Sequence, residues 1–423
     1  MNRTRLKIFF IFFTAGFYFL SCHSNVFGQF KKNGGSVYSS FGIGDLNYSV
    51  SGRSDAMGIL GIGLLGNYSN SLNPAAWTGI TNTRFSTDFN LNNINSSDGS
   101  STAKRTYADF EGFNFAVPIN KGNGWIFDAG LHTYSVVNYD ITERGSSVGE
   151  NYSHIYSGEG GLSRISLGTS YILFHNFSFG LQFNYAFGTI TKENRIIWDN
   201  TSIFNTTNST TNSLAGYYFT TGLSFHGFDK LFKSKSLGNL NVAALFSTPM
   251  KMTSNISGRY DRSTGADTVD ITDGNLNLPL AFGLGISNQF KNNLVVAADI
   301  YFQNWDAYKY YGVHPAEFKN SMRAGAGFEY TPSLRVEDAF FSRVSYRLGG
   351  YFSNGYLSID GQPVKTFGVT AGISLPLSRI NAFDINLSYE RRGTTTNGLV
   401  LDNFYKLGIA VEIGEFWLFR TGD

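Results

Sequence analysis

The sequence has little of what soluble enzymes and helical membrane proteins depend on. It holds one cysteine, eight prolines and 15% charged residues, whereas soluble domains usually carry ~25% charged residues. If Cys22 is removed with a leader peptide, disulfides, thiolate metal sites and cysteine nucleophiles are all excluded. The mean hydropathy of −0.13 excludes a bundle of membrane helices. The net charge of +2 gives no reason to expect nucleic acid as a partner.

One long apolar run, residues 8–20, follows the basic start of the chain. It is shorter than the ~20 residues that span a bilayer as a helix, and it fits the core of a signal peptide. We expect a signal peptide over residues 1–28, with a mature chain that begins at Gln29. A lipoprotein signal cleaved before Cys22, in the stretch FLSC, is the alternative. Both interpretations predict an exported protein.

Aromatic residues, at 16%, and 48 glycines are abundant, and from residue 83 onward apolar and polar residues alternate as they do in β-strands. In the clearest segment, residues 177–187, large apolar side chains share one face and small or polar residues the other. Such a run matches the ~9–11 residues that cross a bilayer as a tilted strand. The pattern recurs at 84–91, 113–119, 125–141, 162–173, 177–189, 214–225, 239–248, 276–287, 294–303, 322–330, 344–352, 364–377, 383–391 and 405–413.

About fourteen strands, an even number, indicate an all-β fold: an antiparallel transmembrane β-barrel. Short connections rich in Asn and Gly alternate with long polar ones, as expected for periplasmic turns and extracellular loops. The long connections, expected to be loops, are residues 142–161, 190–213, 249–275 and 304–321. We therefore expect the barrel over residues 83–413 and a periplasmic tail over 414–423.

Residues on the polar phase of the strands are expected to face the barrel lumen, because a charge that faces lipid at mid-bilayer costs ~2–4 kcal/mol. Larger apolar residues in the lumen would offer an apolar solute a place to rest. The candidate lumen-facing residues are Asp88, Ile126, His132, Tyr134, Tyr218, Arg343 and Arg347.

Residues 29–82, before the first expected strand, show no sustained alternation but hold many apolar side chains. Such a segment is too apolar to stay a solvated tail, and the nearest cavity is the lumen, so we infer a lumenal plug, or hatch. Pro74 lacks a backbone N–H, fixes its own φ and keeps Asn73 out of helical geometry. This predicts a rigid turn that ties off the plug before the first strand. An ordinary tight turn without a gating role is the alternative.

The segment also resembles the N-terminal hatch of the FadL-type (OMPP/TodX-like) family of outer-membrane barrels, especially its Bacteroidetes forms. The matching stretches are YSSFGIGDL (38–46), RSDAMG (53–58) and LNPAAW (72–77). The resemblance implies a fourteen-stranded barrel in the outer membrane of a Gram-negative bacterium, with an Asn-Pro-Ala turn in its hatch. The hatch or gating candidates that it implies here are Arg53, Met57, Asn73, Pro74, Ala75 and Trp77.

Other chemistry has weaker support in the sequence. GIGLLG (61–66) matches a dinucleotide-binding pattern but lacks the βαβ context that would give it meaning, so its glycines are interpreted as allowing tight turns. Ser224 precedes His226 by two residues on one strand face, yet no nucleophile motif such as G-x-S-x-G is present. The carboxylates of residues 267–273 do not have EF-hand spacing. The sequence predicts no enzyme, no cofactor and no metal site.

Two functions remain from different classes. The first is an outer-membrane channel for passive uptake of small hydrophobic molecules, with long-chain fatty acids as the type that the resemblance implies. The second is a non-transporting accessory barrel in an outer-membrane secretion or assembly machine, similar to the related PorV barrel of type IX secretion. Both predict contact with membrane lipid. The first adds a hydrophobic small-molecule ligand, and the second adds outer-membrane protein partners.

Overall fold

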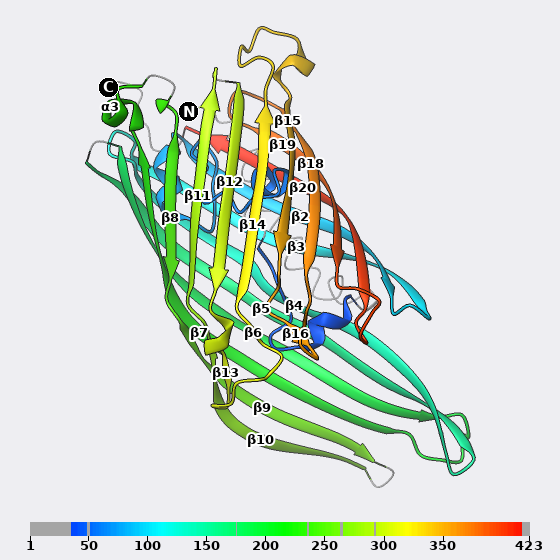
Figure 1. The fold of residues 1–423 in the computed structure, drawn as a ribbon. Coiled ribbons are helices and arrows are strands. Elements are labelled where there is room, and N and C mark those ends of the chain that lie inside the picture. Colours follow the sequence, from blue (N-terminus) through cyan, green and yellow to red (C-terminus); the bar gives the residue numbers. More distant parts are fainter. Residues whose placement is uncertain are drawn as a thin grey trace, which may run out of the picture. The chain divides into compact units, whose positions relative to one another are not determined.

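Strands form most of the chain in this computed structural model, which describes residues 35–48, 51–174, 176–234, 237–262, 265–291 and 293–416 (Figure 1). The expected signal peptide and both of its cleavage points lie outside the described residues, as does most of the expected periplasmic tail. Among the described residues, no helix is both long and apolar enough to cross a membrane.

Long strands pair with their neighbours in antiparallel order around a ring. They are β2 (Thr83–Ser97), β3 (Thr102–Asn120), β4 (Trp125–Ser147), β5 (Glu150–Phe174), β6 (Phe177–Trp198), β7 (Thr206–His226), β8 (Asn241–Ser247), β9 (Met250–Arg262), β10 (Gly265–Leu278), β11 (Ala281–Phe290), β12 (Leu294–Gln303), β14 (Ser321–Tyr330), β15 (Ser345–Ser353), β18 (Thr366–Pro376), β19 (Ala382–Arg392) and β20 (Leu401–Glu415). The first strand, β2, pairs with β3 on one side and with the last strand, β20, on the other. The ring is therefore closed, as lipid requires of a spanning sheet.

Two members of the ring are each made of two consecutive strands. β7 pairs with both β8 and β9, and β10 and β11 pair in turn with β9 and β8. The breaks fall at Pro249 and Pro279, next to residues that begin or end a strand, because proline cannot donate to a ladder. Counted this way, the described residues form a closed barrel of fourteen antiparallel strands. The predicted fold class is confirmed.

Shorter elements precede the barrel or lie in its connections. They are η1 (Val37–Ser40), β1 (Asp45–Leu46), α2 (Gly52–Ala56), η2 (Pro74–Gly79), α3 (Phe228–Phe232), η4 (Trp305–Ala307), β13 (Lys309–Tyr310), η5 (Phe340–Arg343), β16 (Ser358–Ile359) and β17 (Gln362–Pro363). The last strand ends two residues later than predicted, at Glu415 rather than Ile413. The β20 pairing with β2 carries the ladder through these residues.

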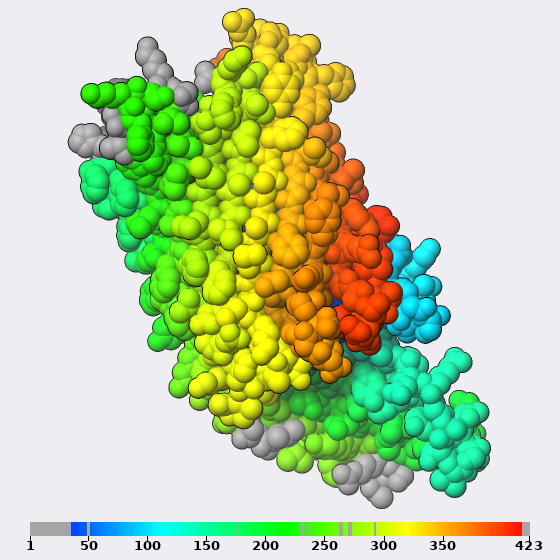
Figure 2. Space-filling model, in the orientation of Figure 1, coloured from blue at the N-terminus to red at the C-terminus, as the bar shows by residue number. Residues whose placement is uncertain are grey.

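The alternation predicted for β6 separates two faces of the wall. Leu181, Phe183 and Tyr185 are about 40% exposed on the outer face, whereas Gln182 and Asn184 are buried on the inner face. Exposure of aromatic and aliphatic groups on every second residue is the arrangement expected against lipid. Figure 2 shows one side of this outer surface, where the side chains of neighbouring strands cover the wall continuously.

Three of the connections expected to be loops are instead paired strands, so that part of the prediction is wrong. The β4–β5 hairpin runs to Ser147 and Glu150. The β6–β7 pair continues through residues 190–198 and 206–213, and the β9–β10 pair through 250–262 and 265–275. These hairpins reach beyond the other strands at one end of the barrel (Figure 1). Apolar alternation stops where a strand leaves lipid, but the Thr, Ser and Asn residues there still form ladders. Loss of alternation was therefore misread as loss of strand.

The wall also has a gap. β3 and β4 pair only between Gly112–Asn120 and Trp125–His132, although both strands continue well beyond that point. In the space between them, the short strand β1 pairs with β4, with Leu46 opposite Ser135. The Arg105 guanidinium crosses the same space and donates to the carbonyls of Gly35 and Asp140. The N-terminal part of the chain thus completes this section of the wall.

The extended ladders predict slow amide exchange outside the membrane. Amide hydrogens of residues 190–198 and 206–213 are expected to exchange about tenfold more slowly, or slower still, than those of residues 331–339, because only the former are held by ladder hydrogen bonds. Hydrogen-exchange mass spectrometry on detergent-purified protein measures both segments in one experiment. Equal rates would show that these hairpins behave as the loops first expected.

Candidate functional site

The N-terminal segment (residues 35–48 and 51–82) lies inside the ring of strands. η2 packs against β4, β5, β6 and β7, whereas α2 packs against β15, β18, β19 and β20 across the ring. Between them, Gly63 approaches β11 so closely that a Cβ on Gly285 would lie 2.4 Å from the Gly63 nitrogen. Because these strands surround the segment, its backbone occupies the barrel interior at this level (Figure 1).

The predicted turn at Asn73, Pro74 and Ala75 is held from within and from the wall. The Asn73 side chain accepts from the Ala75 N–H at 3.1 Å and donates to the Ile62 carbonyl at 2.6 Å. Asn73 caps η2, with Pro74 at its first position, where a missing N–H has no cost. A Cβ on Gly180 of β6 would lie 2.3 Å from the Pro74 carbonyl carbon, so only glycine lets the wall approach this closely.

Trp77 anchors the end of the segment. Its side chain is fully buried, and its Nε1–H donates to the Asn70 carbonyl at 2.6 Å. The ring packs with Ile80 of the segment and with Ala116 and Ile126 of the wall. Ile126, one of the residues expected to face the lumen, therefore already has an apolar partner from the chain itself.

Arg53 and Met57 hold the other end of the segment. Arg53 makes two hydrogen bonds to the Glu329 carboxylate, at 3.0 and 2.7 Å, and lies over the Tyr68 ring. Glu329 also pairs with Arg347 at 2.7 Å. Met57 is fully buried, and its carbonyl fills space that a Cβ on Gly349 would need. Charge pairing and backbone contact thus fix α2 against β14 and β15.

Arg347 continues this ion pair to Asp384 at 2.9 Å, and Arg84 pairs nearby with Glu412. All four side chains belong to the wall and are at least 89% buried. Buried charges are stable only when paired and hydrogen-bonded. The polar phase here joins strands of the wall to one another, and Glu329 connects this network to Arg53 of the segment.

The other residues predicted to face the lumen do not form one cluster, and each has its own neighbours. Asp88 lies beside Gly52 of α2, and His132 shares a 2.7 Å hydrogen bond with Asn114. The rings of Tyr134 and Tyr218 lie 6.3 Å apart.

Arg343, predicted to face the lumen from a strand, belongs instead to η5 in the turn before β15, with its guanidinium 5.8 Å from the Phe340 ring. Arg343 already precedes the predicted strand start at Val344, and the lumenal phase of the strand does not extend to it, because β15 begins at Ser345.

Ser224 and His226, the pair considered as a catalytic alternative, do not form a hydrogen bond with each other. The Ser224 hydroxyl donates to the Asn241 side chain at 2.7 Å rather than to His226. In the GIGLLG stretch, Gly61 has a positive φ of 71° and serves a turn of the segment, as interpreted from the sequence.

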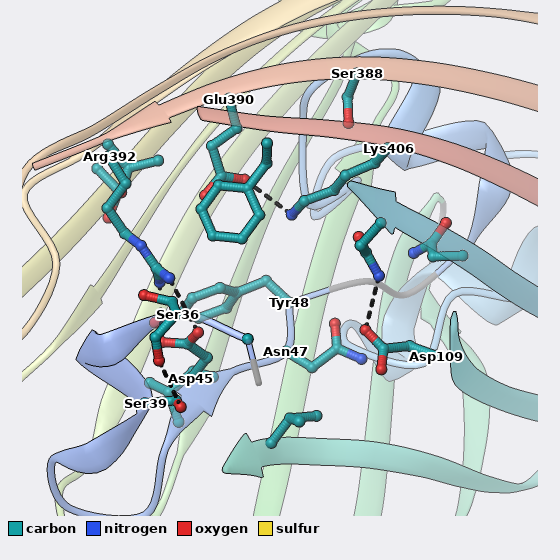
Figure 3. A pocket seen from close by; sticks show the side chains of 18 of the residues that line it. Ser36, Ser39, Asp45, Asn47, Tyr48, Asp109, Ser388, Glu390, Arg392 and Lys406 are labelled. Atoms are coloured by element: carbon teal, nitrogen blue, oxygen red, sulfur yellow. Dashed lines mark hydrogen bonds and ion pairs between the residues drawn. The ribbon is translucent and has the colours of Figure 1, made fainter. Parts of the chain in front are cut away.

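A cavity of about 240 Å³ lies between the N-terminal segment and strands β2, β3, β4, β14, β15, β18, β19 and β20. Arg392 binds Asp45 through two hydrogen bonds, at 2.9 and 3.1 Å, and Lys406 binds Glu390 at 2.9 Å (Figure 3). Burial raises the pKa of the Tyr48 phenol in the segment to about 12, so it stays neutral. Its lining combines these charged groups and several amides with apolar and aromatic side chains such as Leu46, Tyr107 and Phe404.

The sequence did not predict that the residues lining this cavity lie together. Asp109 and Glu111 lie on a part of β3 that was not predicted to be a strand, since the expected strand began at residue 113. Tyr107, Asp109 and Glu111 alternate with exposed residues, but the β-bulge at Glu111 reverses the phase of β3 relative to Asn114, so the alternation after residue 113 could not be extended back to them. Asp45 could not be placed at all, because its position depends on the path of the segment inside the barrel.

The ion pairs of Arg53 predict a measurable contribution to stability. Glu329→Gln keeps the shape of the side chain but removes the carboxylate that pairs with the buried guanidinium groups of Arg53 and Arg347. Arg347 keeps its pair with Asp384, so the loss falls mainly on Arg53, and the free energy of unfolding should fall by about 3 kcal/mol. Asp261→Asn breaks the exposed Arg259–Asp261 pair and should cost less than about 1 kcal/mol. Urea unfolding of the protein from lipid vesicles compares the two variants. A loss for Glu329→Gln no larger than that of Asp261→Asn would argue against a fixed segment.

Solved structures share this fold. The toluene transporter TodX of Pseudomonas putida aligns with a TM-score of 0.57 at 16% identity, covering 88% of this chain and all of its own. The toluene transporter TbuX of Ralstonia pickettii gives 0.57 at 13%, covering 87% and 98%. A FadL homologue of Pseudomonas aeruginosa gives 0.55 at 11%, covering 88% and 99%. At these identities the likeness extends to the fold alone.

No curated protein matches the chain. The family model described as BamG matches residues 11–421, which is nearly the whole sequence. The match includes the N-terminal segment, the closed barrel and the extended hairpins described above. The chain therefore belongs to the BamG family.

Proposed function

We propose that this protein is an outer-membrane barrel that does not transport solutes and that serves as an accessory subunit of a multiprotein outer-membrane machine. The N-terminal segment would act in it as a permanent plug. Of the two functions that the sequence leaves open, this one agrees better with the interior of the barrel. The family name BamG is in keeping with it.

The observation that carries the proposal is the close contact between the backbone of the segment and the glycines of the wall. At Gly180, Gly285 and Gly349, an added Cβ would lie 1.9 to 2.4 Å from main-chain atoms of the segment. Such contacts leave no room for a solute to pass between the two surfaces. Ion pairs at Arg53 then oppose movement of the segment, because separating buried charges is costly.

Uptake of small hydrophobic molecules is the second candidate, and the fold favours it, since toluene transporters share the barrel. The lining of the interior argues against it. The largest apolar cluster is made by Tyr38 and Ile43 of the segment packed against strand residues such as Leu162, Leu214 and Met252. These apolar groups are buried against one another, while the cavity that stays open has charged side chains such as Glu390, Arg392 and Lys406 in its lining. A ligand pocket for an apolar molecule is normally lined mainly by apolar side chains.

The extended hairpins suit a partner-bound protein. β4–β5, β6–β7 and β9–β10 carry a paired sheet beyond the rest of the barrel on one side. A sheet of this kind offers a rigid surface outside the lipid, which a barrel that only conducts solute does not need. Interfaces of lasting complexes bury surfaces of at least about 1,000 Å², and this sheet is a surface on which one could form.

Native purification separates the two functions. If the protein is an accessory subunit, purification in mild detergent should retain stoichiometric outer-membrane proteins, detectable by mass spectrometry. Shortening the β6–β7 hairpin by removing residues 192–211 should release them while the barrel still folds. Recovery of an isolated barrel with bound fatty acid or hydrocarbon, and no protein partner, would overturn the accessory role in favour of uptake.

Electrical recordings test the plug. Deleting residues 29–66 should leave a barrel that assembles, because its strands close their own hydrogen bonds, and its conductance in planar bilayers should rise well above that of the intact protein. Pro74→Gly should do less, since the freedom it restores to the unfolded chain is worth about 1 kcal/mol. If the intact and deleted proteins conduct equally, the segment does not seal the lumen.

A further inference from the structure

The strand β4 has one unpaired edge where it extends beyond the barrel (Figure 1). Its pairing with β5 continues to the end of the hairpin, where Ser147 lies opposite Glu150. On the other side, β3 pairs with β4 only as far as His132, and β1 pairs only with Ser135 and Val136. Among the described residues, no further strand pairs with this side of β4. Residues 137–147 therefore form an edge strand.

The hydrogen bonds near the base of this edge show which residues face it. In an antiparallel strand, the N–H and C=O groups of one residue point to the same neighbour, and successive residues alternate between the two sides. The Asn138 carbonyl accepts from the Gly35 N–H at 2.6 Å, and the Asn138 N–H donates to the Ser39 hydroxyl at 3.1 Å. The Asp140 carbonyl accepts from the Arg105 guanidinium at 2.6 Å. Even-numbered residues of β4 thus turn their main-chain groups to the unpaired edge.

Thr142, Arg144 and Ser146 continue this alternation toward the tip of the hairpin. The register with β5 has no shift between Ser135 and Ser147, so the main-chain groups of these three residues also face the unpaired edge. All three are exposed, and in the part of the chain that the structure describes no group bonds to them from that side. Such a row of unpaired donors and acceptors is a template for another strand.

The N-terminal segment already uses this edge in the way that a strand does. β1 pairs with it antiparallel, and Gly35 extends the contact to Asn138. The unpaired part begins after Asp140, whose carbonyl is occupied by Arg105. The edge therefore has the geometry to accept added chain, and its free part continues directly from a section where such an addition exists.

The other edge of the extended sheet is less suited to pairing. β10 forms that edge, and its register with β9 shifts between Asp270 and Thr272. Such an irregularity bends a strand and disrupts its ladder, which is one way that proteins keep edges from pairing. β4 has no shift between Ser135 and Ser147. Of the two edges, β4 is therefore the better template for a further strand.

We propose that an extended segment of a partner protein adds to the β4 edge at residues 142–146 as a further β-strand. The inference rests on the accessory role proposed above, and it names where and how the partner binds. In strand addition, main-chain hydrogen bonds give affinity and alternate side chains give specificity.

The two faces of the edge indicate the side chains that the partner strand should carry. Ile141 packs toward the apolar cluster of the interior, whereas Arg144, at the opposite phase of β4, is exposed. Neighbouring side chains on one face of a sheet stabilise it when both are apolar or when their charges are opposite. We therefore expect an apolar residue next to Ile141 and an acidic residue next to Arg144.

Proline variants test whether the main chain of β4 makes the contact. Thr142→Pro and Arg144→Pro each remove an N–H from the unpaired edge and place a ring there, without taking a hydrogen bond from β5. Each should lower the amount of partner that copurifies about tenfold or more, with the circular dichroism of the barrel unchanged. Thr142→Val is the matched control. It keeps the N–H and the branched side chain, and should retain the partner as wild type does.

Hydrogen exchange resolved to single residues gives a second measurement. The amides of Thr142, Arg144 and Ser146 should exchange rapidly in the isolated barrel and at least about tenfold more slowly in the natively purified complex, because a ladder hydrogen bond protects an amide. Slow exchange already in the isolated barrel would mean that the edge is filled without a partner, and the proposal would be wrong.

The outcomes separate this inference from the accessory role itself. If no protein copurifies with the wild type, both are wrong. If partners copurify and stay bound to both proline variants, the accessory role stands and strand addition to β4 is refuted. If the mass of the complex shows a second copy of this chain as the only retained protein, the edge serves self-association and the proposed partner is excluded.

Discussion

Every backbone N–H and C=O in the membrane must find a partner within the protein, and the rest of this structure depends on that constraint. It forces the strands into a closed ring, and closure sorts the side chains: apolar groups such as Leu181 and Phe183 face outward, and polar groups such as Gln182 and Asn184 face inward. The ring therefore encloses a polar interior that has to be filled with water, with ligand or with the chain itself.

In this protein the chain fills much of that interior. Glycines at Gly180, Gly285 and Gly349 remove side chains from the inner wall where the segment passes, and the segment brings its backbone into the space they leave. The lumenal charges then acquire partners, as in the chain of contacts from Arg53 through Glu329 and Arg347 to Asp384. Wall and segment are thus complementary in shape and in charge.

The same fold can therefore serve different ends. The barrel is shared with toluene transporters, but fold does not fix function, which depends on the groups placed within it. Here apolar groups of the wall such as Leu214 and Met252 are buried in one cluster with Tyr38 and Ile43 of the segment. The remaining cavity has charged side chains such as Asp109, Arg392 and Lys406 beside the apolar groups of its lining. These side chains, rather than the strands, set the chemistry of this interior.

The sequence alone determined the strands in lipid, because alternation with a period of two is imposed locally by the two faces of a strand. It also determined the rigid turn at Pro74, since proline carries its constraint wherever it stands. The sequence did not reveal the paired hairpins, such as β6–β7 beyond residue 190, because alternation disappears where both faces meet water. Nor did it place Arg343, whose position depends on where β15 begins. Only the tertiary structure decided that Asp45 meets Arg392 and that Arg53 meets Glu329. Those pairs join residues hundreds of positions apart, and a contact between them exists only once the ring has closed around the segment.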